Sequence, residues 1–404
     1  MRKLFPWYFV ADEDYDTVWA KGVLTVDTNV MLDLYRYNKT TREALLVALE
    51  SFSGRFWISH QTATEFVKNR RVVIGDMSND FSKAKKPVDD VEKTTKTAVD
   101  AIRACRVIPK ELSEAFEADI LKSCKTIRDG IEKERTEIPD YEVKDEVVQR
   151  LEAALVGCIG SQPDDIEDDL KEAHRRKEAK IPPGYMDDSK DGLGFAGDYL
   201  MWKQIISHGE KNKTPIILVT SETKEDWWEK KSGKTLNPRL ELLQEAFEKT
   251  GHRFLIYHTD QFLRIHQKRS GDTADETVFA EIREYSLARE PAVSVVQEVD
   301  SASGISNTGK LRISISRSVK SFTGTGRFDP KLAKSPEVLV SVVGSPDDAS
   351  NVWARANTGT NHDFNVHVHP GELGKMMPVG EYIIEYEASC SALSEDTKSE
   401  EVAE

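Results

Sequence analysis

The run Gly22-Val-Leu-Thr-Val-Asp27 decides the fold class, and Thr28-Asn-Val-Met-Leu-Asp33 follows it directly in a helical pattern. The run is short, apolar and rich in β-branched residues, as in a strand buried on both faces of a parallel sheet. Similar runs are Arg55-Phe-Trp-Ile-Ser59, Thr214-Pro-Ile-Ile-Leu-Val-Thr220 and Arg253-Phe-Leu-Ile-Tyr257. Helix-period stretches lie between them at 61–73, 197–208 and 238–250, where Pro238 suits a first helical turn. Strands alternating with helices predict an α/β domain with a mainly parallel sheet.

Changes in composition and in the periodicity of apolar residues along the chain predict five regions. The α/β domain is assigned to residues 1–80 and 181–268, interrupted by a charge-dense helical insertion at 81–180 of three or four helices. The insertion is expected to be a solvated helical arm, with a substrate- or partner-binding arm as the alternative. A helical linker at 269–290 leads to a small all-β, sandwich-like domain at 291–390, where apolar residues alternate with period two. The acidic tail at 391–404 is expected to be disordered.

Composition and charge exclude several classes of protein. Of 404 residues, 39% are hydrophobic and 31% charged, as in ordinary globular domains. No apolar run reaches the ~18–20 residues that span a bilayer, and no signal-peptide pattern begins the chain, so we expect no membrane association. The four cysteines form no CxxC pair, which favours free thiols in a reducing cytoplasm.

The net charge of −14 is uneven. Residues 271–404 hold 12 Lys and Arg against 22 Asp and Glu, which leaves a net charge of only −4 for residues 1–270. The total argues mildly against a nucleic-acid binder, but net charge says little about a local cleft.

Four groups of acidic residues stand at strand ends or helix starts. They are centred on Asp27 with Asn29, on Glu65, on Asp198 after Gly197, and on Glu222 with Asp226. Each alone could be a helix cap or a solvated side chain. Carboxylates gathered at one sheet edge repel one another unless a divalent cation lies among them, and Mg²⁺ or Mn²⁺ favours such ligands. Two ions ~3.5–4 Å apart would activate water and stabilise the leaving oxygen of a phosphodiester.

Other chemistries have weaker support. No Cys/His set has zinc spacing, and no Gly-x-x-x-x-Gly-Lys-Ser/Thr loop is present. His367 and His369 fall on one strand face with His362 nearby. We expect these histidines to be ordinary surface residues rather than metal ligands. Trp227 and Trp228 are expected in the core. The alternative is that they line the substrate site and contact nucleic-acid bases.

Several spaced motifs between residues 20 and 265 together point to one family. They are Asp27-Thr-Asn-Val-Met-Leu-Asp-Leu-Tyr35, Trp57-Ile-Ser-His-Gln-Thr-Ala-Thr-Glu-Phe66 with Asn69-Arg70, Ile181-Pro-Pro-Gly-Tyr185, Gly197-Asp198, and Val219-Thr-Ser-Glu-Thr-Lys-Glu-Asp-Trp-Trp228 with Pro238-Arg239. In this order they resemble the PIN-like domain, in particular its bacterial branch with an inserted helical region. The resemblance does not cover the β domain.

The resemblance implies a three-layer α/β/α fold and a nuclease that uses Mg²⁺ or Mn²⁺. It places the metal ligands on Asp27, Glu65, Asp198 and Glu222, the last a departure from a Thr-x-Asp pattern. Asp226 stands nearby, so the pattern leaves both acids open as catalytic residues. Asn29 would support the site, and Arg70, Lys224 and Arg239 are candidates for substrate phosphates; each cation could instead pair with local acids.

Three functions remain open at this point. The first is an endonuclease acting on a nucleic acid, with RNA favoured over DNA because many PIN-like enzymes cut RNA, and with a single-strand or structure-specific DNA nuclease as its variant. The second is a phosphatase of the haloacid-dehalogenase kind, disfavoured because Asn29 replaces its second Asp. The third is an inactive PIN-like domain that binds nucleic acid or protein. A defence or stress role, a protein partner for the β domain and self-association are further expectations.

Overall fold

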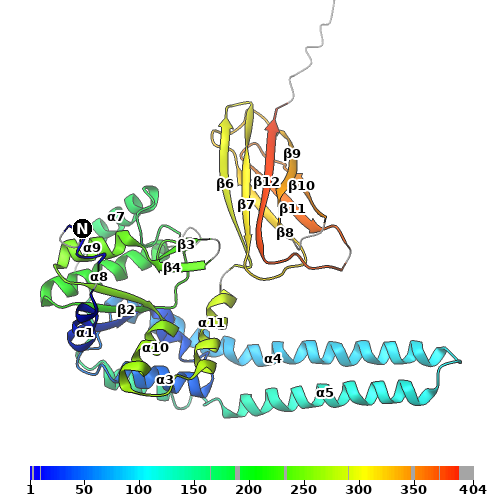
Figure 1. Cartoon of the computed structure of the whole chain (residues 1–404), viewed down its shortest axis with the longest axis horizontal. Coiled ribbons are helices and arrows are strands. Elements are labelled where there is room, and N and C mark those ends of the chain that lie inside the picture. The colour runs from blue at the N-terminus through cyan, green and yellow to red at the C-terminus, as the bar shows by residue number, and fades with distance from the viewer. Residues whose placement is uncertain are drawn as a thin grey trace, which may run out of the picture. The chain divides into compact units, whose positions relative to one another are not determined.

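The computed structural model describes residues 1, 4–9, 11–163, 165–186, 192–231, 234–289, 291–346, 351–372 and 374–390. The chain divides into an α/β unit, residues 1–229 and 237–284, and a β unit, which takes in 230–236 and 285–404 (Figure 1). The prediction of a disordered tail at 391–404 lies outside the described residues. Among those described, no helix has both the length and the apolarity needed to cross a bilayer.

The α/β unit is built on the predicted parallel strands. Its sheet has the strands β1 (Val23–Val26), β2 (Ile216–Thr220) and β5 (Phe254–His258), in the order β1-β2-β5. A separate two-stranded pair, β3 (Trp228–Lys231) and β4 (Lys234–Pro238), crosses the division at residues 230–236. β1 and β2 are parallel with Val26 opposite Val219, and β2 and β5 are parallel with Val219 opposite Tyr257. β2 is buried throughout, which explains its continuous apolar sequence.

Among the described residues, the sheet continues beyond β1 through single-residue bridges and not through a further strand. Phe56 pairs with Leu24, and Ile58 pairs with Ile159, both as parallel bridges. The run 55–59 therefore lies where the sequence predicts a strand, but it does not form a regular one. The chain that follows β1 leads to the run 55–59 on one side of the sheet, and the chain that follows β2 leads to β5 on the other side. The adjacent carboxyl ends of β1 and β2 therefore form a topological switch point, where open α/β sheets bind ligands.

Helices cover both faces of this sheet, giving the three-layer α/β/α arrangement (Figure 1). The helices are α1 (Asp12–Lys21), α2 (Thr28–Asp33), α3 (Lys39–Glu50), α4 (His60–Ala104), α5 (Lys110–Glu137), α6 (Glu146–Ala154), α7 (Glu167–Glu178), the 3-10 helix η1 (Gly192–Ala196), α8 (Gly197–Asn212), α9 (Leu240–Thr250), α10 (Thr259–Ser270) and α11 (Glu276–Arg289). Local caps fix several starts: Asn38 accepts from Thr41 N at 2.9 Å, and Ser59 from Thr62 N at 3.0 Å.

Two details of the helices differ from the sequence expectation. Pro238 ends β4 and α9 begins at Leu240, so the prediction of Pro238 in a first helical turn is wrong. α4 also does not end near Val73 but continues through Pro87 to Ala104. The boundary predicted at residue 80 therefore falls within a continuous helix.

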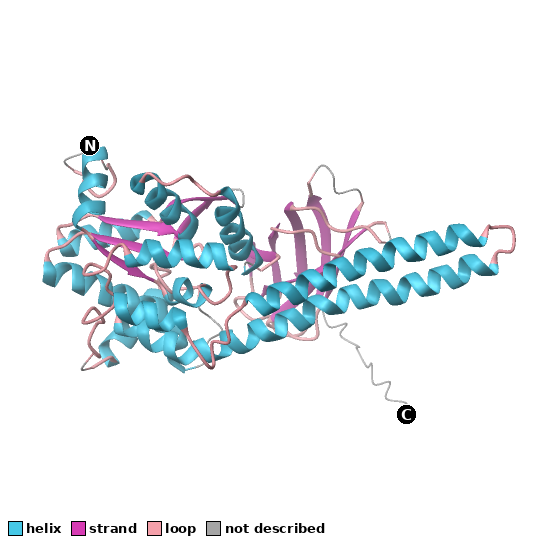
Figure 2. Cartoon of the chain, turned by 90° about the horizontal axis from the view of Figure 1, so that it is seen from below, coloured by secondary structure: helices cyan, strands magenta, loops and turns pink. Residues whose placement is uncertain are grey.

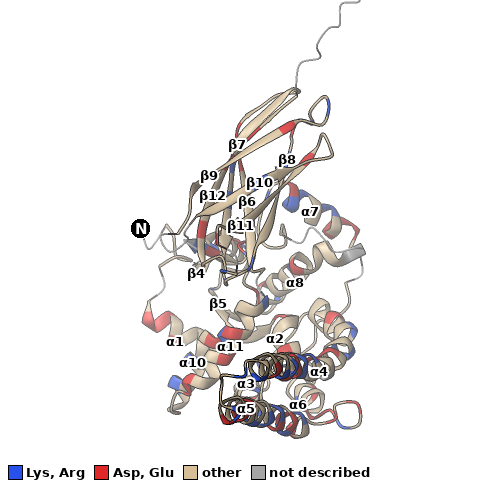
Figure 3. Cartoon of the chain, turned by 90° about the vertical axis from the view of Figure 1, so that its right-hand side faces the viewer, with Lys and Arg blue, Asp and Glu red and all other residues tan. Residues whose placement is uncertain are grey.

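The inserted helices form a long antiparallel pair. At ~1.5 Å per residue, the 45 residues of α4 extend about 67 Å, and α5 runs back beside it (Figure 2). Basic and acidic side chains are interspersed along both helices (Figure 3), and Arg128 of α5 pairs with Asp89 and Glu92 of α4 at 2.9 and 3.1 Å. Such exposed pairs contribute little stability each.

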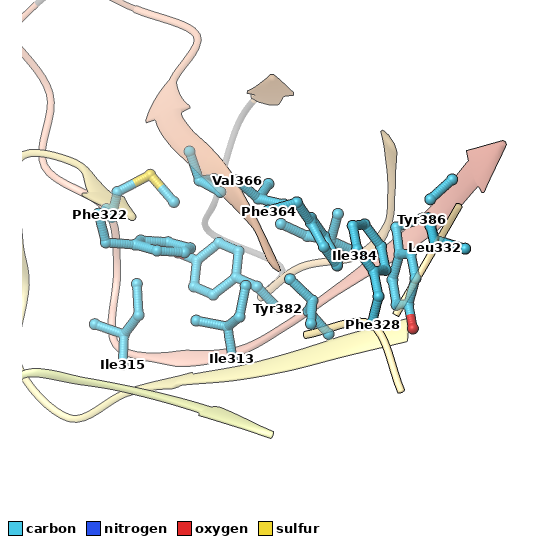
Figure 4. Close-up of a cluster of buried hydrophobic side chains, with 14 residues drawn as sticks. Ile313, Ile315, Phe322, Phe328, Leu332, Phe364, Val366, Tyr382, Ile384 and Tyr386 are labelled. Atoms are coloured by element: carbon cyan, nitrogen blue, oxygen red, sulfur yellow. The ribbon is translucent and has the colours of Figure 1, made fainter. Parts of the chain in front are cut away.

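The β unit is an antiparallel sandwich with its own core. Its strands are β6 (Val293–Ala302), β7 (Ser306–Ile315), β8 (Phe322–Arg327), β9 (Glu337–Gly344), β10 (Val352–Asn357), β11 (Asp363–Pro370) and β12 (Gly380–Ser389). They form a four-stranded sheet β6-β7-β12-β9 and a three-stranded sheet β10-β11-β8. Between the sheets, Phe364 packs against Phe328 and Tyr386 with ring centroids 5.0 and 4.7 Å apart (Figure 4).

We expect the central strand β2 to carry much of the stability of the α/β unit. Leu218 is fully buried, so Leu218→Ala should lower the free energy of unfolding by about 2–5 kcal/mol, measured by urea denaturation followed by tryptophan fluorescence. Val47→Ala on the exposed side of α3 is the control and should change it by less than about 0.5 kcal/mol. Equal effects of the two substitutions would contradict this description of the core.

Candidate active site

Asp27 is held at the carboxyl end of β1, beside the end of β2. Its backbone N–H donates to the Val219 carbonyl at 2.9 Å, which extends the β1–β2 register by one residue. Asp27 is the N-cap residue of α2, but its side chain makes no capping hydrogen bond. Instead its Oδ2 accepts from Thr220 Oγ1 at 3.0 Å and from Asn29 Nδ2 at 3.3 Å. The carboxylate is therefore oriented by neighbours at the strand ends rather than used to start the helix.

Glu65 lies in the second turn of α4 and is fixed by two donors. Its Oε1 accepts from Gln61 Nε2 at 2.7 Å and its Oε2 from Thr28 Oγ1 at 3.1 Å. Because Thr28 is the residue after Asp27, the second bond joins α4 to the end of β1. These two hydrogen bonds fix the Glu65 carboxylate beside the same strand end.

Gly197 brings the start of α8 against Glu65. A Cβ atom built on Gly197 would lie 2.7 Å from Glu65 Oε1, closer than real Cβ contacts allow. The glycine therefore permits a close approach that any other residue would hinder. The next residue is Asp198, whose Oδ2 accepts from Trp227 Nε1 at 3.2 Å. The Gly-Asp pair thus brings the start of α8 against Glu65, with Asp198 as the next residue.

Glu222 and Lys224 complete the cluster from the loop after β2. Glu222 Oε1 accepts from the backbone N–H groups of Thr223 and Lys224 at 2.9 and 3.3 Å. The Lys224 ammonium lies 2.9 Å from Glu222 Oε2 and 3.8 Å from Asp198 Oδ2. A cation of the protein itself therefore bridges two of the acids.

The pKa of Asp27 reflects the proximity of two other carboxylates. The pKa of Asp27 rises from its ordinary 3.8 to about 6, first because the group is buried and then because the carboxylates of Glu222 and Glu65 repel its charge. Hydrogen bonds from Thr220 and Asn29 oppose the rise. Burying this carboxylate beside like charges costs stability, as is common where a site is shaped for a ligand.

Asp226 is engaged by backbone donors, although the charges of Lys224 and Glu222 still act on it. It is fully buried, and its Oδ2 accepts from the backbone N–H groups of Gly184 and Met186 at 2.9 and 3.3 Å. Its Oδ1 has no hydrogen-bond partner among the described residues, and burial raises the pKa of the group. Asp226 thus anchors the segment 184–186, whereas Glu222 lies beside Asp27.

The candidate phosphate-binding cations have different surroundings. Arg70 is engaged inside the fold: its Nε donates to Asp145 Oδ2 at 2.8 Å and to Tyr35 Oη at 3.0 Å. Arg239 precedes α9 and donates to Glu241 at 2.8 Å. Only Lys224 touches the acids of the cluster in the described part of the chain. Trp227 and Trp228 are both buried in the core, as expected from the sequence.

The donor chemistry suits a divalent cation, although no coordination shell is preformed. Asp27, Glu65, Asp198 and Glu222 offer only carboxylate oxygens, the ligands that Mg²⁺ and Mn²⁺ favour. Across the described ranges, no three Asp, Glu, His or Cys side chains are already arranged to hold a metal. A cation would have to draw the carboxylates together and compete with the Lys224 ammonium, which now neutralises part of their charge.

The sequence does not reveal which hydrogen bonds orient the acids. Thr220 and Thr28 orient Asp27 and Glu65 through their hydroxyls, and Gln61 holds the other oxygen of Glu65. Each stands within four residues of an acid in the sequence. A polar residue next to or one helical turn from a candidate acid is the signal that would have indicated them.

A sheet switch point lined by acids, in a sheet covered by helices on both faces, is a ligand-binding position of an α/β domain. The family model described as PIN like domain matches residues 23–242, more than half of the chain. The chain belongs to the PIN-like domain family, and at this coarse level it is a nuclease-type protein whose substrate is nucleic acid. No curated protein matches the chain.

The raised pKa of Asp27 predicts a pH-dependent effect of Asp27→Asn. Because the folded protein holds the proton more tightly than the unfolded chain, stability is lost as pH rises from 4 through 6, and the full repulsion is present above that range. Asp27→Asn should therefore raise the free energy of unfolding at pH 8 by up to about 3 kcal/mol, at about 1.4 kcal/mol per pKa unit. The gain should vanish near pH 4. Urea denaturation in EDTA at both pH values checks this, and an equal gain at both would contradict it.

Proposed function

We propose that the protein is a metal-dependent endonuclease that hydrolyses phosphodiester bonds, with RNA favoured over DNA. The observation that carries the proposal is the convergence of Asp27, Glu65 and Glu222, with Asp198 joined through Lys224, at one switch point of the sheet. These acids come from four separate segments of the chain. Buried like charges are costly, so their convergence is best explained by a cation that neutralises them in use.

Asp27, Glu65, Asp198 and Glu222 would hold Mg²⁺ or Mn²⁺. When bound, such ions activate water and stabilise the leaving oxygen of the phosphodiester. Thr220, Thr28 and Gln61 keep the carboxylates oriented, since each donates a hydrogen bond to one of them. Asn29 supports Asp27 in the same way. We assign Asp226 to the support of the segment 184–186 and leave it out of the ligand set.

Lys224 has two roles in this proposal. Without a metal it reduces the repulsion between Glu222 and Asp198. With metal bound to the acids, the Lys224 ammonium would contact a phosphate of the substrate. Arg239 is the second candidate for such a contact, whereas the engagement of Arg70 with Asp145 and Tyr35 favours a structural role.

One observation favours a second candidate function. Because Lys224 already neutralises part of the cluster, the site could bind nucleic acid without metal and without cleavage. An inactive PIN-like binding domain would then account for the same geometry. Divalent-cation dependence separates the two candidates.

The biological setting is proposed at a broader level. Fusion of a nuclease unit to a separate β unit suits an effector in defence or stress response, with the β unit contacting a partner. The four cysteines are all unpaired, as in proteins of the reducing cytoplasm, where we propose that the protein acts.

The test is cleavage of end-labelled single-stranded RNA and DNA of the same sequence. With Mn²⁺ or Mg²⁺ we expect cleavage, RNA faster than DNA, and none in EDTA. Asp27→Asn and Asp198→Asn should each reduce the rate by about 100-fold or more, because each removes a ligand of a metal worth several kcal/mol to the transition state. Faster cleavage of DNA would instead support the DNA-nuclease variant.

Two matched comparisons sharpen this experiment. Asp168→Asn, on the exposed face of α7, should leave the rate unchanged. Glu222→Gln should abolish cleavage, whereas Asp226→Asn should retain it within about tenfold because an amide oxygen can still accept from Gly184 and Met186. No cleavage of either polymer by folded wild-type protein, or full activity of Asp27→Asn and Asp198→Asn, would overturn the proposal.

A further inference from the structure

The outer face of the three-stranded sheet β10-β11-β8 is the most distinctive surface of the β unit. Alternate residues of these strands, such as Phe322, Phe364 and Val366, point into the core (Figure 4). The residues between them face solvent and pair directly across the strands. The central members of this outer face are Trp353, Arg355, His369, His367, Asn365 and Thr325.

Trp353 forms an exposed aromatic platform. It lies opposite His369 in the register, and the two rings stack with centroids 4.8 Å apart and an interplanar angle of 21°. Half of the Trp353 surface remains in solvent. A large aromatic ring that is held by a neighbour yet left half exposed offers a surface on which a planar group can stack.

Polar groups surround this platform in an ordered way. His367 is opposite Arg355 on one side and Thr323 on the other, and its Nδ1 lies 2.9 Å from Thr323 Oγ1. Asn365 Oδ1 accepts from Thr325 Oγ1 at 2.8 Å, and this bond uses only the acceptor side of the amide. The face thus presents a guanidinium and amide donors beside the aromatic ring.

Charge distinguishes this outer face from that of the other sheet. On the four-stranded sheet, Lys310 and Arg312 are paired with Glu385 and Glu298 at 2.9 and 2.6 Å. On the three-stranded sheet, Arg355 forms no ion pair with any described carboxylate.

Asp363 is the one described carboxylate on the three strands of this face. It accepts from Thr360 and lies 3.7 Å from His362 Nε2, so its charge is partly compensated. The local charge of this face, with Arg355 exposed and one partly compensated carboxylate, therefore suits an anionic group despite the net negative charge of the region.

We propose that the outer face of β10-β11-β8 binds single-stranded nucleic acid. A base would stack on Trp353, a phosphate would contact Arg355, and the amide of Asn365 would donate to a base edge. From Trp353 to Asn357 the face extends about 13 Å along the strands and about 10 Å across the three of them. This area accommodates about two or three nucleotides.

The binding test uses the whole chain and a fluorescently labelled single-stranded 10-mer in EDTA, read by fluorescence anisotropy. Trp353→Ala should weaken binding at least about fivefold, and Trp353→Phe should restore most of it because stacking needs only a ring. Arg355→Gln should weaken binding and reduce the slope of log K against log salt concentration by about 0.7. Arg312→Gln on the other sheet is the matched control and should bind as wild type does.

A second measurement separates this face from the nuclease site. Photocrosslinking of a 4-thiouridine-containing oligonucleotide, mapped by mass spectrometry, should give adducts on the peptide that contains Trp353. Asp27→Asn should retain these adducts even where it abolishes cleavage, so failure of the nuclease proposal would leave this one standing. The inference would be overturned if Trp353→Ala and Arg355→Gln both bound within twofold of wild type, or if the adducts were confined to the α/β unit. A protein partner would then be the better occupant of this face.

Discussion

The repulsion among carboxylates at the end of β1 is the constraint on which the site depends. Asp27 is almost fully buried, and Glu65 and Glu222 lie close enough to raise its pKa to about 6. A fold that served only stability would separate these charges or replace them with neutral groups. The protein instead positions hydroxyl and amide donors around them, which keeps the acids together without removing their charge.

Several elements of the fold bring these acids together despite their repulsion. The parallel register of β1 and β2 places Asp27 beside Thr220, and the Ser59 cap sets where α4 begins and therefore where Glu65 projects. Gly197 lets α8 approach Glu65 closely enough for Asp198 to join the cluster. Lys224 balances part of the charge. Each of these elements places a different side chain of the cluster, so the acids come from segments that are far apart in the chain.

Much of the fold was predictable because its signals are local. The continuous apolar runs of β2 and β5 predict buried parallel strands, and period-two alternation predicts most of the β unit. The sequence of β8 lacks apolar alternation because its inward positions include Gly324 and Gly326. A Cβ at Gly326 would lie 2.3 Å from the Phe364 ring, so the ring fills the space that an apolar side chain would occupy. The uninterrupted run of α4 through Pro87 depends on its packing beside α5, which spacing alone does not reveal.

The site was predictable as a set of acids but not as an arrangement. Spacing left Glu222 and Asp226 equivalent, and only tertiary contacts show that Asp226 binds the backbone at Gly184 and Met186. The same holds for Arg70, whose partner Asp145 lies 75 residues away. Calorimetric titration with Mn²⁺ shows whether these acids form a cation site. We expect saturable binding to the wild-type protein that is lost in Asp27→Asn and Glu222→Gln and kept in Asp226→Asn. Binding that is absent from wild type, or unchanged in Asp27→Asn, would contradict the account.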